Sequence, residues 1–145
     1  MPNNCLNRFF ITGEQSSLQK FWDGLKKFDG HDESENGEIY IFKSYIPMPV
    51  ELRNTSQFKD TPNWHDWVMA NWGSKWGDYE TEINFSPTMI SGHFFSAWGP
   101  CEEGFVNLSR MFPDLNFSFL YEEPGMCLSG ERVFKNGIML DVIKK

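Results

Sequence analysis

The chain has 145 residues, of which 20 are Asp or Glu and 13 are Lys or Arg, so its formal net charge is −7. This length fits one domain, residues 1–145, that buries about two thirds of the surface its unfolded chain would expose. The negative charge argues against duplex DNA or RNA as a partner, because phosphate binding needs a basic face. No apolar run approaches the roughly 18 residues that span a bilayer, and the first residues lack the pattern of a secretion signal.

Three cysteines, Cys5, Cys101 and Cys127, form no Cys-x-x-Cys pair. An odd count without paired spacing is typical of free thiols in a reducing compartment. We therefore expect no intramolecular disulfide.

The first part of the chain predicts a strand followed by a helix. Cys5–Thr12 is predicted to be a strand, with Cys5, Phe9 and Ile11 on one face and Arg8 and Thr12 on the other, and Gly13 ends it. Ser16 and Gln19 have the spacing of a capping box, in which each side chain bonds a backbone amide near the start of a helix. An apolar stripe at helical spacing follows, formed by Leu18, Phe21, Trp22, Leu25 and Phe28.

The next segment predicts a loop and then a strand. Residues 29–38 hold five acids and two glycines, which indicates a mobile, solvated loop. Ile39–Ile46 is a β-type run that is apolar on both faces up to Lys43, so we expect a central strand that ends at Pro47. Residues 50–60 are polar and irregular.

A helix is predicted after this irregular stretch. Thr61 suits the N-cap, and Pro62 suits the first turn, where its missing amide hydrogen costs nothing. The helical face is apolar and carries Trp64, Trp67, Val68 and Trp72, and Gly73 suits the C-terminal end.

The remainder of the chain predicts five more strands and one helix, several of them separated by clear turn signals. The Asn136-Gly137 pair is the preferred type I′ turn of a hairpin. The expected strands are Tyr79–Phe85, Ile90–Trp98, Leu115–Tyr121 and a hairpin of Met126–Lys135 with Ile138–Ile143, and the expected helix is Glu102–Phe112.

The order is therefore β-α-β, a helical insertion, β-β-α-β and a C-terminal hairpin. Helices that cross between strands of one sheet, with hairpins between them, are typical of an α+β fold. We predict a two-layer ferredoxin-like sandwich with an antiparallel-rich sheet. The helices that begin near Ser16 and Glu102 should lie on one face of that sheet.

The sequence shows no constellation of catalytic or metal-binding residues. The histidines are His31, His65 and His93, and none has the spacing of a metal-ligand motif. A nucleophilic pair of His93 with the thiol of Cys101 or Cys127 is a further alternative, but nothing in their spacing requires it. No glycine-rich phosphate loop precedes a helix. We therefore predict no metal, no cofactor and no enzymatic activity.

The strongest local feature lies at the exit of the tryptophan-rich helix, where Trp72 and Trp76 bracket Gly73-Ser74-Lys75. Two indoles, a glycine turn and a cation within five residues can stack a planar ligand and hold an anion. The alternative is a helix end whose lysine complements the helix dipole while both rings are buried. Trp98 and Tyr121 either extend the same surface or fill the core. These residues are the candidate ligand- or partner-binding residues.

Four stretches of the chain stand out together, namely Met1–Asn3 with Asn7, Ile46–Arg53, Trp64 with Asn71–Trp76, and Phe95–Pro100 with Phe112–Leu115 and Tyr121–Gly125. Together they resemble the Api92-like family, also described as YubB ferredoxin-like, of phage, prophage and plasmid proteins. The similarity spans nearly the whole chain, and the NWGSKW and IPMPVEL segments are its specific parts. One departure is Gly99-Pro100-Cys101, where the family tends to have Ser-Pro-Pro.

The resemblance implies a ferredoxin-like sheet and a cytoplasmic protein of a bacterial host, and it brings no established activity. From the family's genetic context we expect a non-catalytic binding protein that acts in counter-defence. It would dock on a host defence protein, presenting acids to a basic groove, which the charge of −7 favours. Alternatively, it would sequester a small nucleotide signal by stacking the base on tryptophan and holding the phosphates with Lys75 and nearby cations. A nucleotide-processing enzyme is a further alternative. Neither the partner nor the oligomeric state follows from the sequence.

Overall fold

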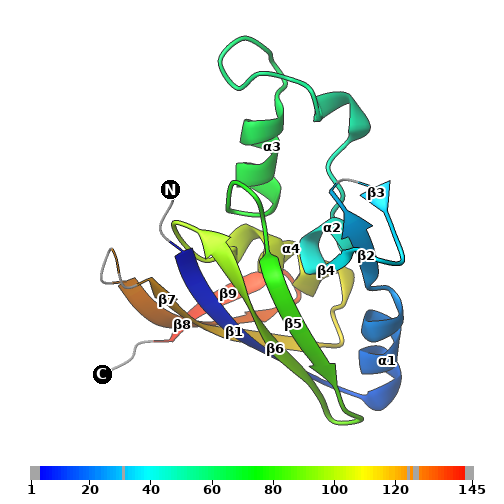
Figure 1. Ribbon diagram of the computed structural model, residues 1–145. Coiled ribbons are helices and arrows are strands. Elements are labelled where there is room, and N and C mark those ends of the chain that lie inside the picture. The colour runs from blue at the N-terminus through cyan, green and yellow to red at the C-terminus, as the bar shows by residue number, and fades with distance from the viewer. Residues whose placement is uncertain (1–3, 31, 124, 126–127, 143–145) are drawn as a thin grey trace.

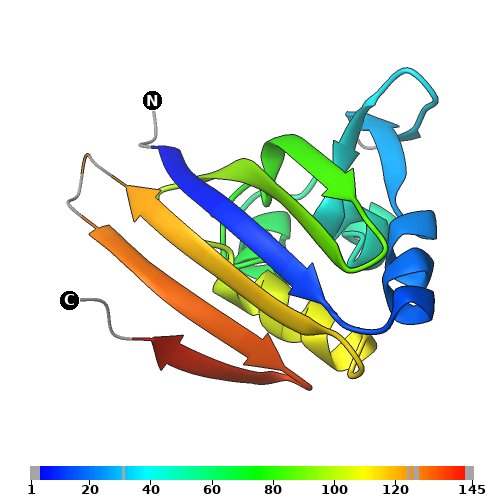
Figure 2. The ribbon, with the colours of Figure 1, turned by 90° about the horizontal axis from the view of Figure 1, so that it is seen from below.

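A six-stranded antiparallel sheet is the centre of the computed structural model, which describes residues 4–30, 32–123, 125 and 128–142. The order in the sheet is β5-β6-β1-β7-β8-β9. Helices α1, α2 and α4 cover one face (Figure 1), and the opposite face is open (Figure 2). The strands are β1 (Asn4–Thr12), β5 (Tyr79–Phe85), β6 (Met89–Ala97), β7 (Asn116–Glu123), β8 (Leu128–Lys135) and β9 (Ile138–Val142), and the helices are α1 (Gln15–Asp23), α2 (Ile41–Tyr45) and α4 (Glu102–Met111).

The elements β1-α1-β5-β6-α4-β7 form the ferredoxin-like unit, because their strands take the order β5-β6-β1-β7 with two helices on one face. The predicted α+β sandwich is thus confirmed, as is the C-terminal hairpin. The turn between β8 and β9 is formed by Asn136 and Gly137, whose φ angles of 49° and 82° are those that a type I′ turn requires.

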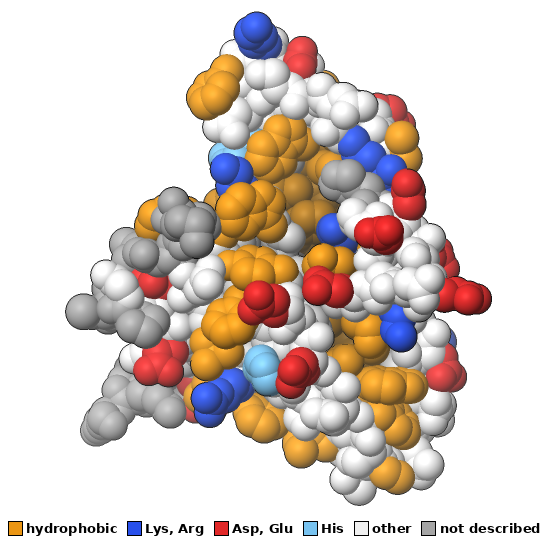
Figure 3. All heavy atoms as spheres, viewed as in Figure 1, with side chains coloured by type: hydrophobic (Ala, Val, Ile, Leu, Met, Phe, Trp, Pro, Cys, Tyr) orange, Lys and Arg blue, Asp and Glu red, His pale blue; other side chains and the backbone are white. Residues whose placement is uncertain are grey.

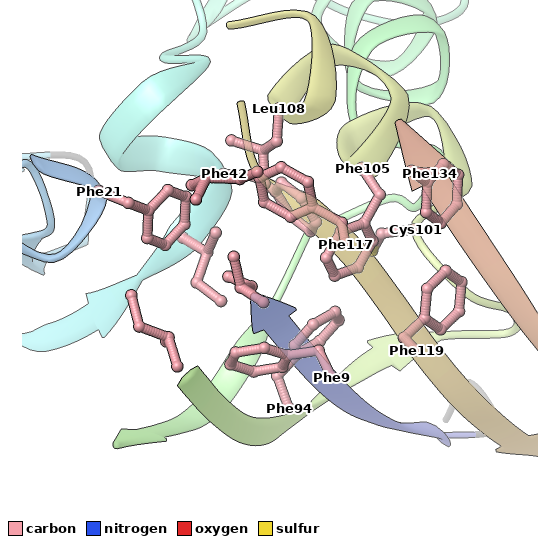
Figure 4. Packing of buried hydrophobic residues seen from close by; sticks show 14 of the residues in the cluster. Phe9, Phe21, Phe42, Phe94, Cys101, Phe105, Leu108, Phe117, Phe119 and Phe134 are labelled. Carbon is pink, nitrogen blue, oxygen red and sulfur yellow. The ribbon is translucent and has the colours of Figure 1, made fainter. Parts of the chain in front are cut away.

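The hydrophobic core lies between the sheet and the helices and is built largely of phenylalanine. The alternating pattern of β1 turns Phe9 and Ile11 inward, as the sequence predicts. Phe105 of α4 stacks on Phe119 and Phe134, with ring centroids 4.9 and 5.5 Å away (Figure 4). Such ring contacts add to the large apolar area that each phenylalanine removes from water.

Between α1 and β5 the chain forms an insertion with a small sheet of its own. This sheet has the order β3-β2-β4, and the insertion also contains a short 3-10 helix and helix α3, which extends away from the large sheet (Figure 1). The elements are β2 (Lys26–Asp29), β3 (Asp32–Glu33), β4 (Glu38–Tyr40), η1 (Val50–Leu52) and α3 (Trp64–Asn71).

The start of the insertion differs from two sequence predictions. The helix expected to continue to Phe28 ends at Gly24, and Phe28 instead lies in β2, where it pairs with Glu33 and Glu38. The predicted mobile loop of residues 29–38 therefore contains β3 and the first residue of β4. The stripe at helical spacing was misleading because its last member, Phe28, lies in a second sheet rather than on the first helix.

The central strand predicted for Ile39–Ile46 is wrong, because only Ile39 and Tyr40 are extended and Ile41–Tyr45 is helix α2. The cause is Asp78, which is distant in the sequence. Its buried carboxylate accepts hydrogen bonds from the amides of Ile41 (2.8 Å) and Phe42 (3.0 Å) and thereby caps the start of α2. A tertiary contact of this kind overrides a local preference for strand.

Both predicted helix caps are also wrong. The first helix begins after Glu14 without a side-chain cap, and Gln19 instead donates to Asp23 one turn later at 2.8 Å. Helix α3 is capped by Asn63 rather than Thr61, and the Asn63 side chain accepts the amide of Asp66 at 3.0 Å. Asparagine is at least as good a cap as threonine, so the nearer residue prevails.

Candidate functional site

The main candidate site is a cleft of about 270 Å³ on the insertion, which we call the indole cleft. In Figure 3 hydrophobic side chains line a hollow beneath the α3 arm, and lysine and arginine side chains lie at its margins. Its volume is just below the roughly 300–1,000 Å³ that is typical of small-molecule sites. The lining residues are Lys43, Met48, Arg53, Trp64, Val68, Trp72, Lys75 and Trp76.

Helix α3 and its exit hold one wall of the indole cleft in place. Trp72 is 4% exposed, and its indole nitrogen donates to the carbonyl oxygen of Ile46 at 2.8 Å. Gly73 follows with a φ of 85°, which turns the chain out of the helix. The buried Ser74 hydroxyl accepts the amide of Ala97 at 3.1 Å, which ties this turn to the end of β6. The turn is therefore anchored on both sides.

Lys75 and Trp76 point away from this anchored turn. Trp76 is 45% exposed, and Lys75 Nζ lies 5.2 Å from the centroid of its ring. Among the residues that the structure describes, Lys75 has no carboxylate within ion-pairing distance. An exposed indole and an ammonium without an acidic partner are thus presented at the mouth of the cleft.

Two more cations reach the cleft from α2 and the loop after η1. Lys43 Nζ donates to the carbonyl oxygen of Gly30 at 2.8 Å and lies over the Tyr40 ring, and burial lowers its pKa below the ordinary value. Arg53 forms an ion pair of 3.5 Å with Asp32, whose side chain is 90% exposed. No Asp or Glu is among the residues that line the indole cleft. In a chain of net charge −7 this is a local concentration of positive charge.

The structure agrees in part with each of the two interpretations of the Trp72–Trp76 segment, the binding surface and the buried helix end. Trp72 is buried and belongs to the hydrophobic core, as the structural alternative expects. Trp76 is exposed and Lys75 lies beside it, as the binding alternative expects. The segment is therefore a helix end that places one indole in the core and one at the surface.

Trp98 and Tyr121 do not line the indole cleft. Trp98 follows β6, is 50% exposed and has a φ of 71°. Tyr121 lies in β7, where its hydroxyl accepts a hydrogen bond of 2.9 Å from Arg132 and its ring contacts Phe119. These two candidates therefore do not belong to the lining of the cleft that Lys75 and Trp76 help to form.

The candidates for nucleophilic chemistry are not brought together. Cys101 is fully buried, and burial raises the pKa of its thiol well above the ordinary value. His93 is on the open face of the sheet, 3.6 Å from Glu82. Within the described part of the chain, no group of three or more His, Cys, Asp or Glu side chains is arranged to hold a metal ion. Cys127 and His31 lie outside the described residues.

Sequence reasoning missed Lys43, Arg53 and Trp64 as lining residues. Lys43 falls in the wrongly predicted strand, and Trp64 was interpreted as core because of its helical spacing. The one available signal was the IPMPVELR segment, which ends in Arg53 and was singled out only for its family resemblance.

The fold and the cleft define a ferredoxin-like α+β protein with an aromatic, cationic cleft on an insertion. The model of the family described as "Ferredoxin-like domain in Api92-like protein" matches residues 71–145. The chain belongs to this Api92-like family, which confirms the resemblance found in the sequence motifs. The matched segment includes Trp72, Lys75 and Trp76 of the cleft but not the α2 side.

A solved structure supports the fold along the whole chain. The crystal structure of the protein api92 from Yersinia pseudotuberculosis is similar with a TM-score of 0.65 and 13% sequence identity, covering 100% of this chain and 99% of that chain. No curated protein matches the sequence. Among the described residues, none of the helices has the length and apolar character needed to cross a membrane.

Proposed function

We propose that this protein is a non-catalytic binding protein whose indole cleft takes a small nucleotide. The observation that carries the proposal is the composition of the cleft: three indoles and three cations without a lining carboxylate, in a protein with 20 acids. Planar bases stack on indoles, and phosphates form strong charge-assisted hydrogen bonds with Lys and Arg. The geometry thus favours the nucleotide alternative of the sequence analysis over the protein-binding one.

The base would stack against Trp76, whose ring is accessible, with Trp64 on the α3 side of the cleft. The phosphates would lie between Lys75, Lys43 and Arg53. Because burial lowers the pKa of Lys43, a bound anion would also stabilise the charged form of its ammonium group. The buried Trp72 would form the floor of the site without moving.

Sequestration rather than turnover is supported by the side chains that line the described cleft, since none of them is a His, Cys, Ser, Thr, Asp or Glu. In this proposal the protein of a phage or mobile element acts inside the bacterial host and removes a nucleotide signal of a defence pathway. The family's genetic context supports this counter-defence role.

The acidic surface of the insertion favours a second candidate, direct binding to a host defence protein. Asp29, Asp32, Glu33 and Glu35 are exposed on or beside strands β2 and β3. Carboxylates presented in this way would complement a basic groove of a partner protein.

Calorimetric titration with 5′-AMP tests the nucleotide proposal. Lys75→Ala should weaken binding about tenfold or more, since it removes a charge-assisted hydrogen bond. Lys20→Ala, on the exposed side of α1, is the matched control and should bind like the unmodified protein. Failure of the unmodified protein to bind AMP at millimolar concentration, or equal affinity of the two variants, would contradict the proposal.

A further inference from the structure

A continuous series of aromatic rings leads from the indole cleft onto the open face of the large sheet. The Trp76 ring meets the edge of Tyr79, with centroids 6.3 Å apart and planes at 73°. Tyr79 in turn stacks on Phe95 of the neighbouring strand β6 at 6.4 Å and 27°. Figure 3 shows hydrophobic side chains continuing from the hollow toward the sheet. We call Tyr79 and Phe95 the outer aromatic pair.

The outer aromatic pair is accessible and held in place. Both side chains are only half-buried, although each belongs to a strand of the large sheet. The Tyr79 hydroxyl donates a hydrogen bond to the side-chain oxygen of Asn4, which fixes the orientation of its ring. A rigid ring that is partly open to solvent costs little to order when a planar group stacks on it.

The charges around the outer aromatic pair differ from those of the cleft. Glu80 and Glu82 are exposed on the same strand as Tyr79, and Glu82 lies 3.6 Å from His93 of β6. Carboxylates at this place disfavour a phosphate but not an uncharged base. The surface therefore has one anion-binding position, in the indole cleft, followed by a second stacking position without anion-binding groups.

The volume of the cleft also supports a ligand that extends onto the outer aromatic pair. A volume of about 270 Å³ is below the roughly 300–1,000 Å³ that is typical of small-molecule sites, so part of a larger ligand would lie outside the cleft, and the exposed Trp76 ring offers one way out. The next surface that it meets is the outer aromatic pair.

We propose that the preferred ligand is a dinucleotide, whose first base and phosphates occupy the indole cleft and whose second base stacks on Tyr79 and Phe95. This inference rests on the proposed function, since it extends the same site. Stacking on an aromatic side chain tolerates every base, so the outer position selects ligand length rather than base identity.

The test compares two probes of similar charge, ADP and the linear dinucleotide pApA, by calorimetric titration of the full chain. For the unmodified protein pApA should bind roughly tenfold tighter than ADP, because it adds one stacked base. Phe95→Leu and Tyr79→Leu should each remove most of this preference, so that the affinities of the variant for pApA and ADP become similar. Phe10→Leu replaces another half-buried ring on the open face, on strand β1, and should keep the full preference.

The outcomes separate this inference from the proposed function. If neither probe binds, both are wrong. If ADP and pApA bind equally well, or if Phe95→Leu keeps the preference as Phe10→Leu does, the nucleotide site stands and the second stacking position is refuted. Thermal melting of each variant confirms that it is folded, and Tyr79→Leu decides the question should Phe95→Leu not fold.

Discussion

Replacing Asp78 by alanine should destabilise the fold far more than is usual for a single acidic residue. Its side chain is 1% exposed, and its carboxylate accepts the amides of Ile41 and Phe42 at 2.8 and 3.0 Å. It also accepts the hydroxyl of Thr81 at 2.6 Å. In the alanine variant two amides at the start of α2 lose their acceptor, and α2 carries Lys43 of the indole cleft.

The magnitude follows from these contacts. A hydrogen bond to a charged group contributes about 1.5–3 kcal/mol, and buried amides left without an acceptor cost a similar amount, so we expect a total loss of about 3–5 kcal/mol. For a domain of this size that loss corresponds to a decrease of roughly 10–15 °C in the melting temperature. Asp114→Ala, at an exposed turn, is the control and should stay within about 0.5 kcal/mol of the unmodified protein.

Thermal and urea denaturation followed by circular dichroism measure both variants. Burial raises the pKa of Asp78, so the folded state holds the proton more tightly than the unfolded chain. Stability conferred by the protonated group is present at low pH and is lost as the pH rises through the folded pKa. The difference between the unmodified protein and Asp78→Ala should therefore become smaller as the pH rises above the ordinary range of a carboxyl group. A melting temperature of Asp78→Ala equal to that of Asp114→Ala would refute the capping role.

Two further predictions concern burial. Trp72→Ala should lower the free energy of unfolding by about 3–5 kcal/mol, because a buried ring and its hydrogen bond are lost. Trp76→Ala should lower it clearly less, because that ring is exposed. Equal losses of the two variants in urea denaturation would contradict the placement of these residues. Burial raises the pKa of the Cys5 thiol from 9.0 to about 11, so stability should fall by about 2–3 kcal/mol between those two pH values as the unfolded chain ionises first. This alkaline loss should be smaller in Cys5→Ala, and an identical pH profile would show that the thiol does not titrate as expected.

Most of the ferredoxin-like unit could be predicted because its patterns are local. Strand β1 alternates cleanly, helix α4 carries Phe105 and Leu108 on one face, and Asn136-Gly137 determines its own turn. The insertion could not be predicted in the same way. The conformation of Ile41–Tyr45 depends on the carboxylate of Asp78, which comes from the other end of the insertion and leaves no signal in the local sequence.

For the same reason, only some of the residues that line the candidate site could be predicted from the sequence. Trp76 and Lys75 are adjacent, so their proximity follows from the chain itself. Lys43 and Arg53 reach the cleft only through the fold of α2 and the loop after η1, and their contribution needs the tertiary structure. Helical spacing indicated that Trp64 faces inward, but it could not show that this side chain would line a cleft.

The most direct test of nucleotide binding in the indole cleft is a titration of the ¹⁵N-labelled protein with AMP, followed through the NMR signals of its six tryptophan indole groups. The signals of Trp76 and Trp64, assigned by substitution, should shift progressively and saturate, since ring stacking changes the local magnetic environment. The signal of Trp22, which packs on Phe85 with ring centroids 5.5 Å apart, should not move. If no indole signal shifts at millimolar AMP, or if the shifts appear at Trp22 and not at Trp76, the cleft is not a nucleotide site.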